Sequence, residues 1–104
     1  MTASGWKGEL YGVRVGKENA AKFFNRSWPS IEVEMDGEVH RFRLSKTFWT
    51  TCPEFRGVAL KKWFFLHGLA PWQDRKPPKV VLMPLTENRF KLTERSLTGG
   101  AAKF

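Results

Sequence analysis

The strongest alternation of hydrophobic and polar residues lies in two runs, 31–35 and 38–44, which flank the dipeptide Asp36-Gly37. Asp-Gly between alternating runs is typical of a two-residue β-hairpin turn, because both turn positions adopt positive φ. The turn also sets the register of the strands, so that Val33 should face His40. The pattern therefore predicts a hairpin with one buried face and one solvated face.

A second hairpin is predicted further along the chain, with strands at 80–85 and 89–93 and a turn between them. Pro84 cannot donate a backbone hydrogen bond, so we expect its strand at a sheet edge or at a bulge. The string Arg89-Phe-Lys-Leu-Thr closely repeats Arg41-Phe-Arg-Leu-Ser of the first hairpin. In each string, strand alternation places Phe and Leu on the buried face and two cations on the outer face.

Two helices are expected in addition to the hairpins. Asn19 can cap a short helix over 20–26. A longer helix is predicted from Thr51 to Gly68, because Thr51 and Glu54 have the spacing of a capping box and Gly68 can adopt the left-handed conformation that ends many helices. One apolar stripe makes this helix the predicted centre of the core. The stripe consists of Phe55, Ala59, Trp63 and Leu66.

These elements make two helix–hairpin units, a weak internal repeat with a period of about 40–48 residues. Chance similarity between two hairpins of similar composition explains the repeat equally well. We expect an α+β fold in which the two units form an antiparallel sheet packed on the central helix. Residues 10–93 should form a single domain, because 104 residues suffice for one hydrophobic core. The segments 1–9 and 94–104 are expected to be a flexible leader and a flexible tail.

Positive charge is concentrated after His40. Positions 41–104 hold 13 Lys and Arg against 4 Asp and Glu, a balance of +9, whereas positions 1–40 hold 5 against 6, a balance of −1. Nine Phe and five Trp are also more than a small core readily hides. A basic surface with exposed aromatic residues is typical of proteins that bind nucleic acid, either DNA or RNA.

The predicted nucleic-acid-binding site has two parts. The first is the outer face of the hairpins, where cations can contact phosphates without regard to base sequence. The second is the proline-rich loop 69–79, where an aromatic ring could stack on a base while cations hold phosphate. The candidates are Arg41, Arg43, Arg89 and Lys91 on the sheet and Trp72, Arg75, Lys76 and Lys79 in the loop. A simpler interpretation also stands: Arg41 only pairs with Glu32 across the strands, and Trp72 only packs over a helix end.

Two other functions remain open. Surplus aromatic residues and exposed sheet edges also suit a protein-interaction module, for example an inhibitor encoded by a mobile element that docks on an acidic partner. A small metal-free ribonuclease could use His40 or His67 with a glutamate for acid–base cleavage, although Glu34 should lie on the face of the hairpin opposite His40. We favour a regulatory or accessory role without catalysis.

Composition excludes several other classes. The single cysteine, Cys52, excludes an internal disulfide framework, and the one cysteine and two histidines lack metal-ligand spacing. No apolar run approaches the length of a membrane-spanning helix, and the first residues show no signal-peptide pattern. We therefore expect a cytoplasmic protein with no cofactor, no metal and no membrane contact. Its uncovered strand edges could pair two copies into a homodimer.

Overall fold

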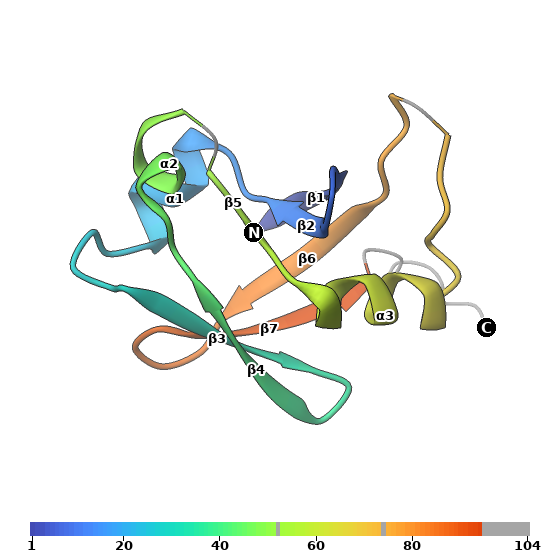
Figure 1. Cartoon of the computed structure of the whole chain (residues 1–104). Coiled ribbons are helices and arrows are strands. Elements are labelled where there is room, and N and C mark those ends of the chain that lie inside the picture. The colour runs from blue at the N-terminus through green and yellow to red at the C-terminus, as the bar shows by residue number, and fades with distance from the viewer. Residues whose placement is uncertain (52, 74, 95–104) are drawn as a thin grey trace.

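The computed structural model describes residues 1–51, 53–73 and 75–94, so most of the predicted tail 94–104 lies outside the described residues. This part of the chain has an α+β fold of seven strands and three helices (Figure 1). The strands are β1 (Thr2–Lys7), β2 (Tyr11–Arg14), β3 (Ser30–Met35), β4 (Glu38–Arg43), β5 (Glu54–Arg56), β6 (Lys79–Pro84) and β7 (Arg89–Glu94). The helices are α1 (Lys17–Phe23), α2 (Lys46–Thr50) and α3 (Val58–Leu66).

All seven strands belong to one sheet in the order β4-β3-β7-β6-β1-β2-β5. Neighbouring strands are antiparallel except for β3 and β7, which run parallel. The sheet is therefore mixed, and the expectation of a wholly antiparallel sheet is wrong. The cause is the way in which the hairpins meet: the first strand of one pairs with the second strand of the other.

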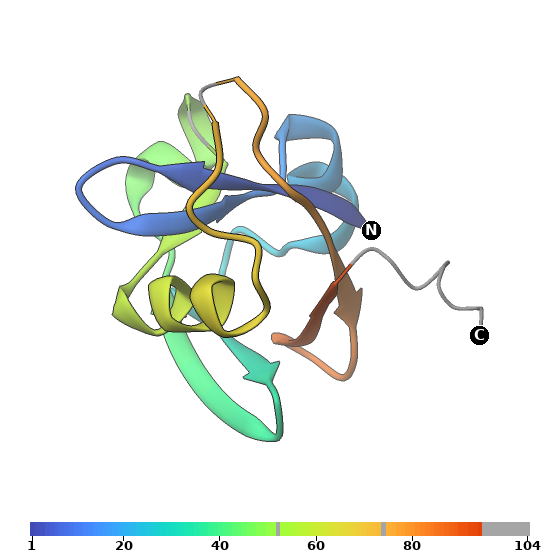
Figure 2. The same ribbon diagram turned by 90° about the vertical axis from the view of Figure 1, so that its right-hand side faces the viewer.

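The sheet curls until its two edge strands approach each other, which gives a nearly closed barrel (Figure 2). Phe42 of β4 and Phe55 of β5 have their ring centroids 5.1 Å apart. Gly57 allows this approach, because a Cβ at that position would lie 3.0 Å from the Phe42 ring. In both views α1 and α2 lie on one side of the barrel and α3 lies on the other (Figures 1 and 2).

The first predicted hairpin is confirmed. β3 and β4 meet at Asp36 and Gly37, whose φ angles of 54° and 85° are those that an Asp-Gly turn requires. The register is the predicted one, with Val33 opposite His40. The turn residues therefore decide which side chains of this hairpin face solvent.

The second hairpin, β6 and β7, is also confirmed, but β6 lies inside the sheet instead of at an edge. Pro84 is tolerated because it is the last residue of β6, beyond the residues that pair with β1. The two hairpins occupy unequal positions, since β4 is an edge strand while β6 has neighbours on both sides. The predicted repeat of two helix–hairpin units is therefore not confirmed by the described fold.

Residues 1–9 do not form a loose leader. Thr2–Lys7 is β1, which lies between β6 and β2 in the sheet. Ala3 is buried, and the backbone N–H of Gly5 donates to the carbonyl of Pro78 at 2.8 Å. Small residues give little hydrophobic signal, so the neighbouring strands on both sides determine this strand more than its own side chains do.

The long helix expected over 51–68 is instead divided into β5 and α3. Thr51 and Glu54 form no capping box, because Glu54 lies in β5 and binds an arginine of β2. Gly57 is extended, with φ 174°, and α3 begins at the next residue. Gly68 does end the helical region, with φ 69°. The helix packs beside β2 and not at the centre of the fold, and its buried residues are Leu60, Trp63 and Phe64.

The first helix begins earlier than the sequence predicts. Asn19 lies inside α1 and does not cap it; its side-chain amide donates to the carbonyls of Val15 at 2.9 Å and Thr2 at 3.1 Å. These bonds tie the start of the helix to β1 and the end of β2. Phe24, just after the helix, is buried against Phe90 with a centroid distance of 4.7 Å, so the end of α1 is fixed to the core.

Candidate nucleic-acid interface

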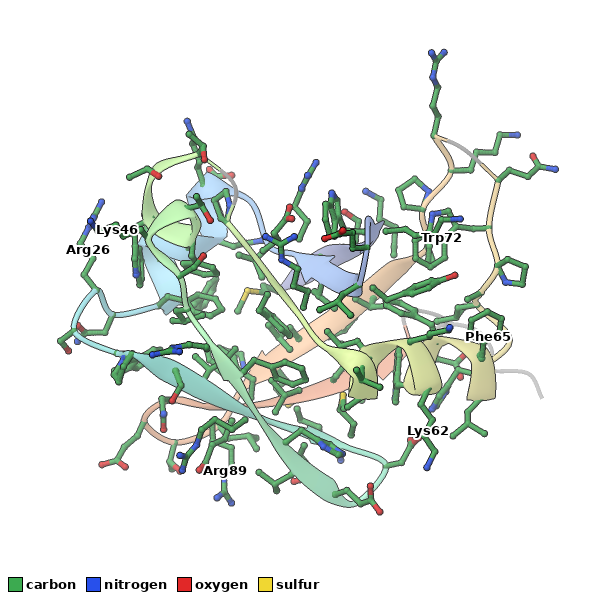
Figure 3. The ribbon with its side chains drawn as sticks, viewed as in Figure 1. Arg26, Lys46, Lys62, Phe65, Trp72 and Arg89 are labelled. Atoms are coloured by element: carbon green, nitrogen blue, oxygen red, sulfur yellow. The ribbon has the colours of Figure 1, made fainter. Side chains whose placement is uncertain are left out.

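The outer face of β4, β3 and β7 carries all four basic residues that were predicted for the sheet. Phe42 and Phe90 are buried in the core, so alternation along their strands sends the neighbouring residues outward. Figure 3 shows Arg89 extending away from the ribbon on this side. The cations are Arg41 and Arg43 on β4 and Arg89 and Lys91 on β7, and all four are exposed. We call this surface the cationic sheet face.

Glu32 of β3 lies between two of these cations, in register with Arg41 on one side and Arg89 on the other. Its carboxylate accepts a hydrogen bond from Arg89 Nη2 at 2.8 Å, and Arg41 Nη2 lies 3.8 Å away. The hydrogen bond from Arg89 lowers the pKa of Glu32 most, partial desolvation raises it, and the charges of both arginines lower it, so the pKa lies below 4.5. Glu32 is therefore ionised at neutral pH.

These ion pairs leave the guanidinium groups largely in solvent. The side chain of Arg41 is 74% exposed and that of Arg89 is 46% exposed. Lys91 lies in register with Glu34, while Arg43 lies opposite Ser30. The face thus holds four cations and two carboxylates, so it is less positive than the sequence suggests. The simpler interpretation, a cross-strand pair of Arg41 with Glu32, describes part of this geometry.

The second part of the predicted site is a separate surface. The loop between α3 and β6 rises on the side of the molecule away from the β3–β4 turn (Figures 1 and 2). Trp72, labelled on this loop in Figure 3, is partly buried, with its ring 5.4 Å from Tyr11 and 5.3 Å from Phe64 in edge-on contacts. Trp72 therefore packs over the core, as the simpler interpretation proposed. The exposed cations of this loop region are Arg75, Lys76 and Lys79.

Beside this loop is a hollow of about 330 Å³ that sequence reasoning missed. Its wall includes Trp6 of β1, which lies in the segment expected to be a leader. The signal that could have found it is the pair Trp6-Lys7, an aromatic residue next to a cation within a glycine-rich stretch. Basic and aromatic residues line the hollow: Trp6, Lys7, Arg14, Trp72 and Arg75.

His67 lies immediately after α3 in another hollow, of about 510 Å³. Its Nδ1 contacts the carboxylate of Glu94, and its Nε2 lies 2.9 Å from Asp36 Oδ2. Burial alone would lower the pKa of His67, but the hydrogen bonds and charges of the two carboxylates outweigh it and raise the pKa above 6.5. A ring with a carboxylate at each nitrogen is stabilised in its doubly protonated form. His67 therefore links three elements and is a poor candidate for a general base.

His40 offers no better arrangement for acid–base catalysis. Its Nε2 lies 3.3 Å from an exposed carboxylate oxygen of Glu38. Glu34 pairs with Val39, so it lies on the opposite face of the hairpin, as the register predicts. The described hairpin has no bulge that would bring Glu34 to His40, which is the pairing that a metal-free ribonuclease built on this hairpin would need.

No family model matches the chain, and neither a curated protein nor a solved structure matches it. Among the residues that the structure describes, no helix is long and apolar enough to cross a membrane. The same residues contain no group of three or more His, Cys, Asp or Glu side chains placed to hold a metal ion. The basic surfaces are therefore the features of the described structure that bear most directly on function.

Proposed function

We propose that the protein binds nucleic acid, DNA or RNA, through the cationic sheet face, with the basic loop between α3 and β6 as a further contact. It would act as a regulatory or accessory factor without catalysis. One observation carries the proposal: cations from two hairpins that are distant in sequence lie on β4 and β7, the two strands that flank β3, and on the same exposed face. Phosphate contacts from such groups give affinity that does not depend on base sequence.

Glu32 has a defined part in this proposal. In the free protein it holds Arg89 and Arg41 close together and limits their movement. Arginine has five N–H donors, so a phosphate can bind the donors that point to solvent while others stay with the carboxylate. The carboxylate then competes with the nucleic acid for the same guanidinium groups, which moderates affinity.

The test is to remove two cations of the face together, with Arg41→Gln and Arg89→Gln. Binding of a labelled DNA duplex is followed by fluorescence anisotropy over a series of salt concentrations. If both residues contact phosphate, the slope of log K against log salt becomes shallower by up to about 1.8, because each full contact contributes about 0.9. Thermal unfolding of the variant shows whether the fold is intact.

Lys61→Gln with Lys62→Gln is the matched control, since it removes the same charge from exposed positions on α3. The control should keep the wild-type slope. An equal loss in both double variants would mean that only net charge matters. An unchanged affinity in the sheet variant would remove the cationic sheet face as the site.

A second candidate, a protein-interaction module, is favoured by a groove of about 410 Å³ beside α3 and the β3–β4 turn. Val58 and Leu66, which line it, are large hydrophobic residues that are mostly exposed. Val58→Ser with Leu66→Ser should abolish any salt-insensitive capture of a protein partner. The same variant should leave binding to nucleic acid unchanged, so the two candidates can be separated.

A further inference from the structure

We propose that the hollow beside Trp6 binds one unpaired nucleotide of a nucleic-acid strand, a site that rests on the proposed nucleic-acid binding. The hollow, of about 330 Å³, is at the lower end of the size range of small-molecule sites, roughly 300–1,000 Å³. It therefore suits a single nucleotide better than a longer segment. Three features of its wall support this assignment.

The first feature is an arginine held in place by a buried carboxylate. Glu54 has a side chain only 4% exposed, and its Oε1 accepts hydrogen bonds from Arg14 Nε at 3.0 Å and Nη2 at 2.9 Å. The Arg14 side chain is 48% exposed and lines the hollow. Its Nη1 makes no hydrogen bond to the described residues, so this donor remains for a phosphate oxygen. Because Glu54 already orders the guanidinium, binding costs little side-chain entropy.

The second feature is convergence of charge. Lys7 comes from the end of β1, Arg14 from the end of β2 and Arg75 from the loop, and all three line the hollow. The carboxylate of Glu54 neutralises one of them. Cations from three separate segments around one hollow favour an anionic ligand such as a phosphate.

The third feature is the ring of Trp6, which is partly exposed and lines the hollow. The Arg56 guanidinium lies 5.1 Å from its centroid, across Gly12, which is in register with both residues. A Cβ at Gly12 would lie 2.6 Å from the carbonyl oxygen of Phe55, so the backbone needs glycine here. Arg56 fixes the indole against the sheet, and the part of the ring that lines the hollow can stack on a base.

Together these features select a particular ligand chemistry. An aromatic wall alone would accept any flat ring, and cations alone would accept any anion. A hollow with both accepts a flat ring that carries a phosphate, and a nucleotide is such a ligand. Stacking between successive base pairs hides the faces of the bases within a duplex, so an unpaired, unstacked nucleotide is the form that can enter.

The experiment compares binding of a labelled 5′-phosphorylated hexathymidylate with binding of a blunt duplex, using Trp6→Ala. Loss of stacking on one base should weaken single-strand binding by about fivefold to a hundredfold and leave duplex binding unchanged. Trp49→Ala is the matched control, because Trp49 also carries an arginine, Arg26, over its ring at 5.3 Å. The control should change neither affinity by more than about twofold.

A second variant tests the same site independently, in case Trp6→Ala does not fold. Lys7→Gln with Arg75→Gln changes only exposed side chains and should also weaken binding of the single strand. If neither variant weakens it, or if Trp49→Ala weakens it equally, the nucleotide site is overturned. Duplex binding that still depends on Arg41 and Arg89 would then leave the proposed function standing, whereas no binding to either DNA or to the corresponding RNA strand and duplex would overturn both.

Competition with adenosine monophosphate (AMP) distinguishes a nucleotide within a strand from a free nucleotide, because both present a base and a phosphate. Failure of AMP to displace the hexathymidylate at millimolar concentration supports a site for a nucleotide within a strand. Displacement by AMP that is lost in Trp6→Ala would overturn the strand as the source and assign the hollow to free nucleotides. Backbone and indole N–H resonances of Trp6, followed by NMR in both titrations, would locate the contact.

Discussion

Replacing Glu32 by glutamine tests how the cationic sheet face works. Glutamine keeps the shape of the side chain and can still accept a hydrogen bond from Arg89, but it removes the negative charge. A change of pH cannot replace the substitution, because the arginines hold the pKa of Glu32 below its ordinary value of 4.5. The variant therefore reveals whether the carboxylate competes with nucleic acid for the guanidinium groups.

The expected change in the salt dependence of binding follows from the two arginines that form ion pairs with Glu32. Arg89 Nη2 is 2.8 Å and Arg41 Nη2 is 3.8 Å from its carboxylate oxygens. Two full phosphate contacts contribute about 1.8 to the slope of log K against log salt, so for duplex DNA the slope in Glu32→Gln steepens by the part of this contribution that the carboxylate suppresses in the wild type. Over a fourfold change of salt, a slope change of about 1.8 corresponds to an additional change in affinity of about tenfold. Binding at low salt should become tighter.

The assay is fluorescence anisotropy with one duplex at salt concentrations from about 50 to about 200 mM. Glu18→Gln is the control, because it makes the same change of net charge at an exposed position on α1. Equal changes in both variants would show a general charge effect. Weaker binding in Glu32→Gln would refute competition and show that the carboxylate mainly positions the arginines.

Two further predictions concern stability. Phe64→Ala should lower the free energy of unfolding by about 3–5 kcal/mol, and its neighbour Phe65→Ala by less than about 1 kcal/mol, because Phe64 is fully buried while Phe65 is 46% exposed. Urea denaturation checks this, and similar losses would contradict the orientation of α3. For His67, whose pKa is raised above 6.5, the stabilisation is complete below that value and is lost as pH rises through the folded pKa. The difference in unfolding free energy between wild type and His67→Gln should therefore shrink as pH rises above 6.5, and a difference that grows with pH would refute the assignment.

The hairpins could be predicted because their information is local. Asp36-Gly37 specifies a turn type, and the turn specifies the register, so Val33 and His40 had to face each other. The face on which Arg41 and Arg89 lie followed from the same alternation. These predictions needed no knowledge of the rest of the chain.

The missed elements depend on distant partners. β1 has few apolar side chains, and its strand conformation comes from pairing with β2 and β6. Thr51 and Glu54 fit a capping box by spacing alone, but Glu54 gains more from its two hydrogen bonds to Arg14 in a neighbouring strand. Local capping and tertiary pairing competed for the same residue, and tertiary pairing prevailed.

The candidate site could be predicted only in part. Strand alternation identified the four cations of the sheet, but the parallel contact that places Glu32 beside Arg89 is not visible in the sequence. Trp72 stood next to cations in a loop, yet its ring packs against Tyr11 and Phe64. Trp6 is not predictable as a site residue because the small residues around it give little hydrophobic signal of a strand.

The parallel pairing of β3 with β7, called the seam here, joins the two hairpins. The proposed binding surface therefore forms only when both hairpins fold together. Asn88 fastens the seam, with its side-chain amide donating to the carbonyl of Ser30 at 3.0 Å and its own carbonyl accepting from the N–H of Glu32 at 2.9 Å. Arg89 meets Glu32 across a sequence separation of 57 residues. Neither hairpin alone possesses this charge arrangement, and β7 is an interior strand with Phe90 and Leu92 in the core, so the cationic sheet face persists until the barrel itself melts.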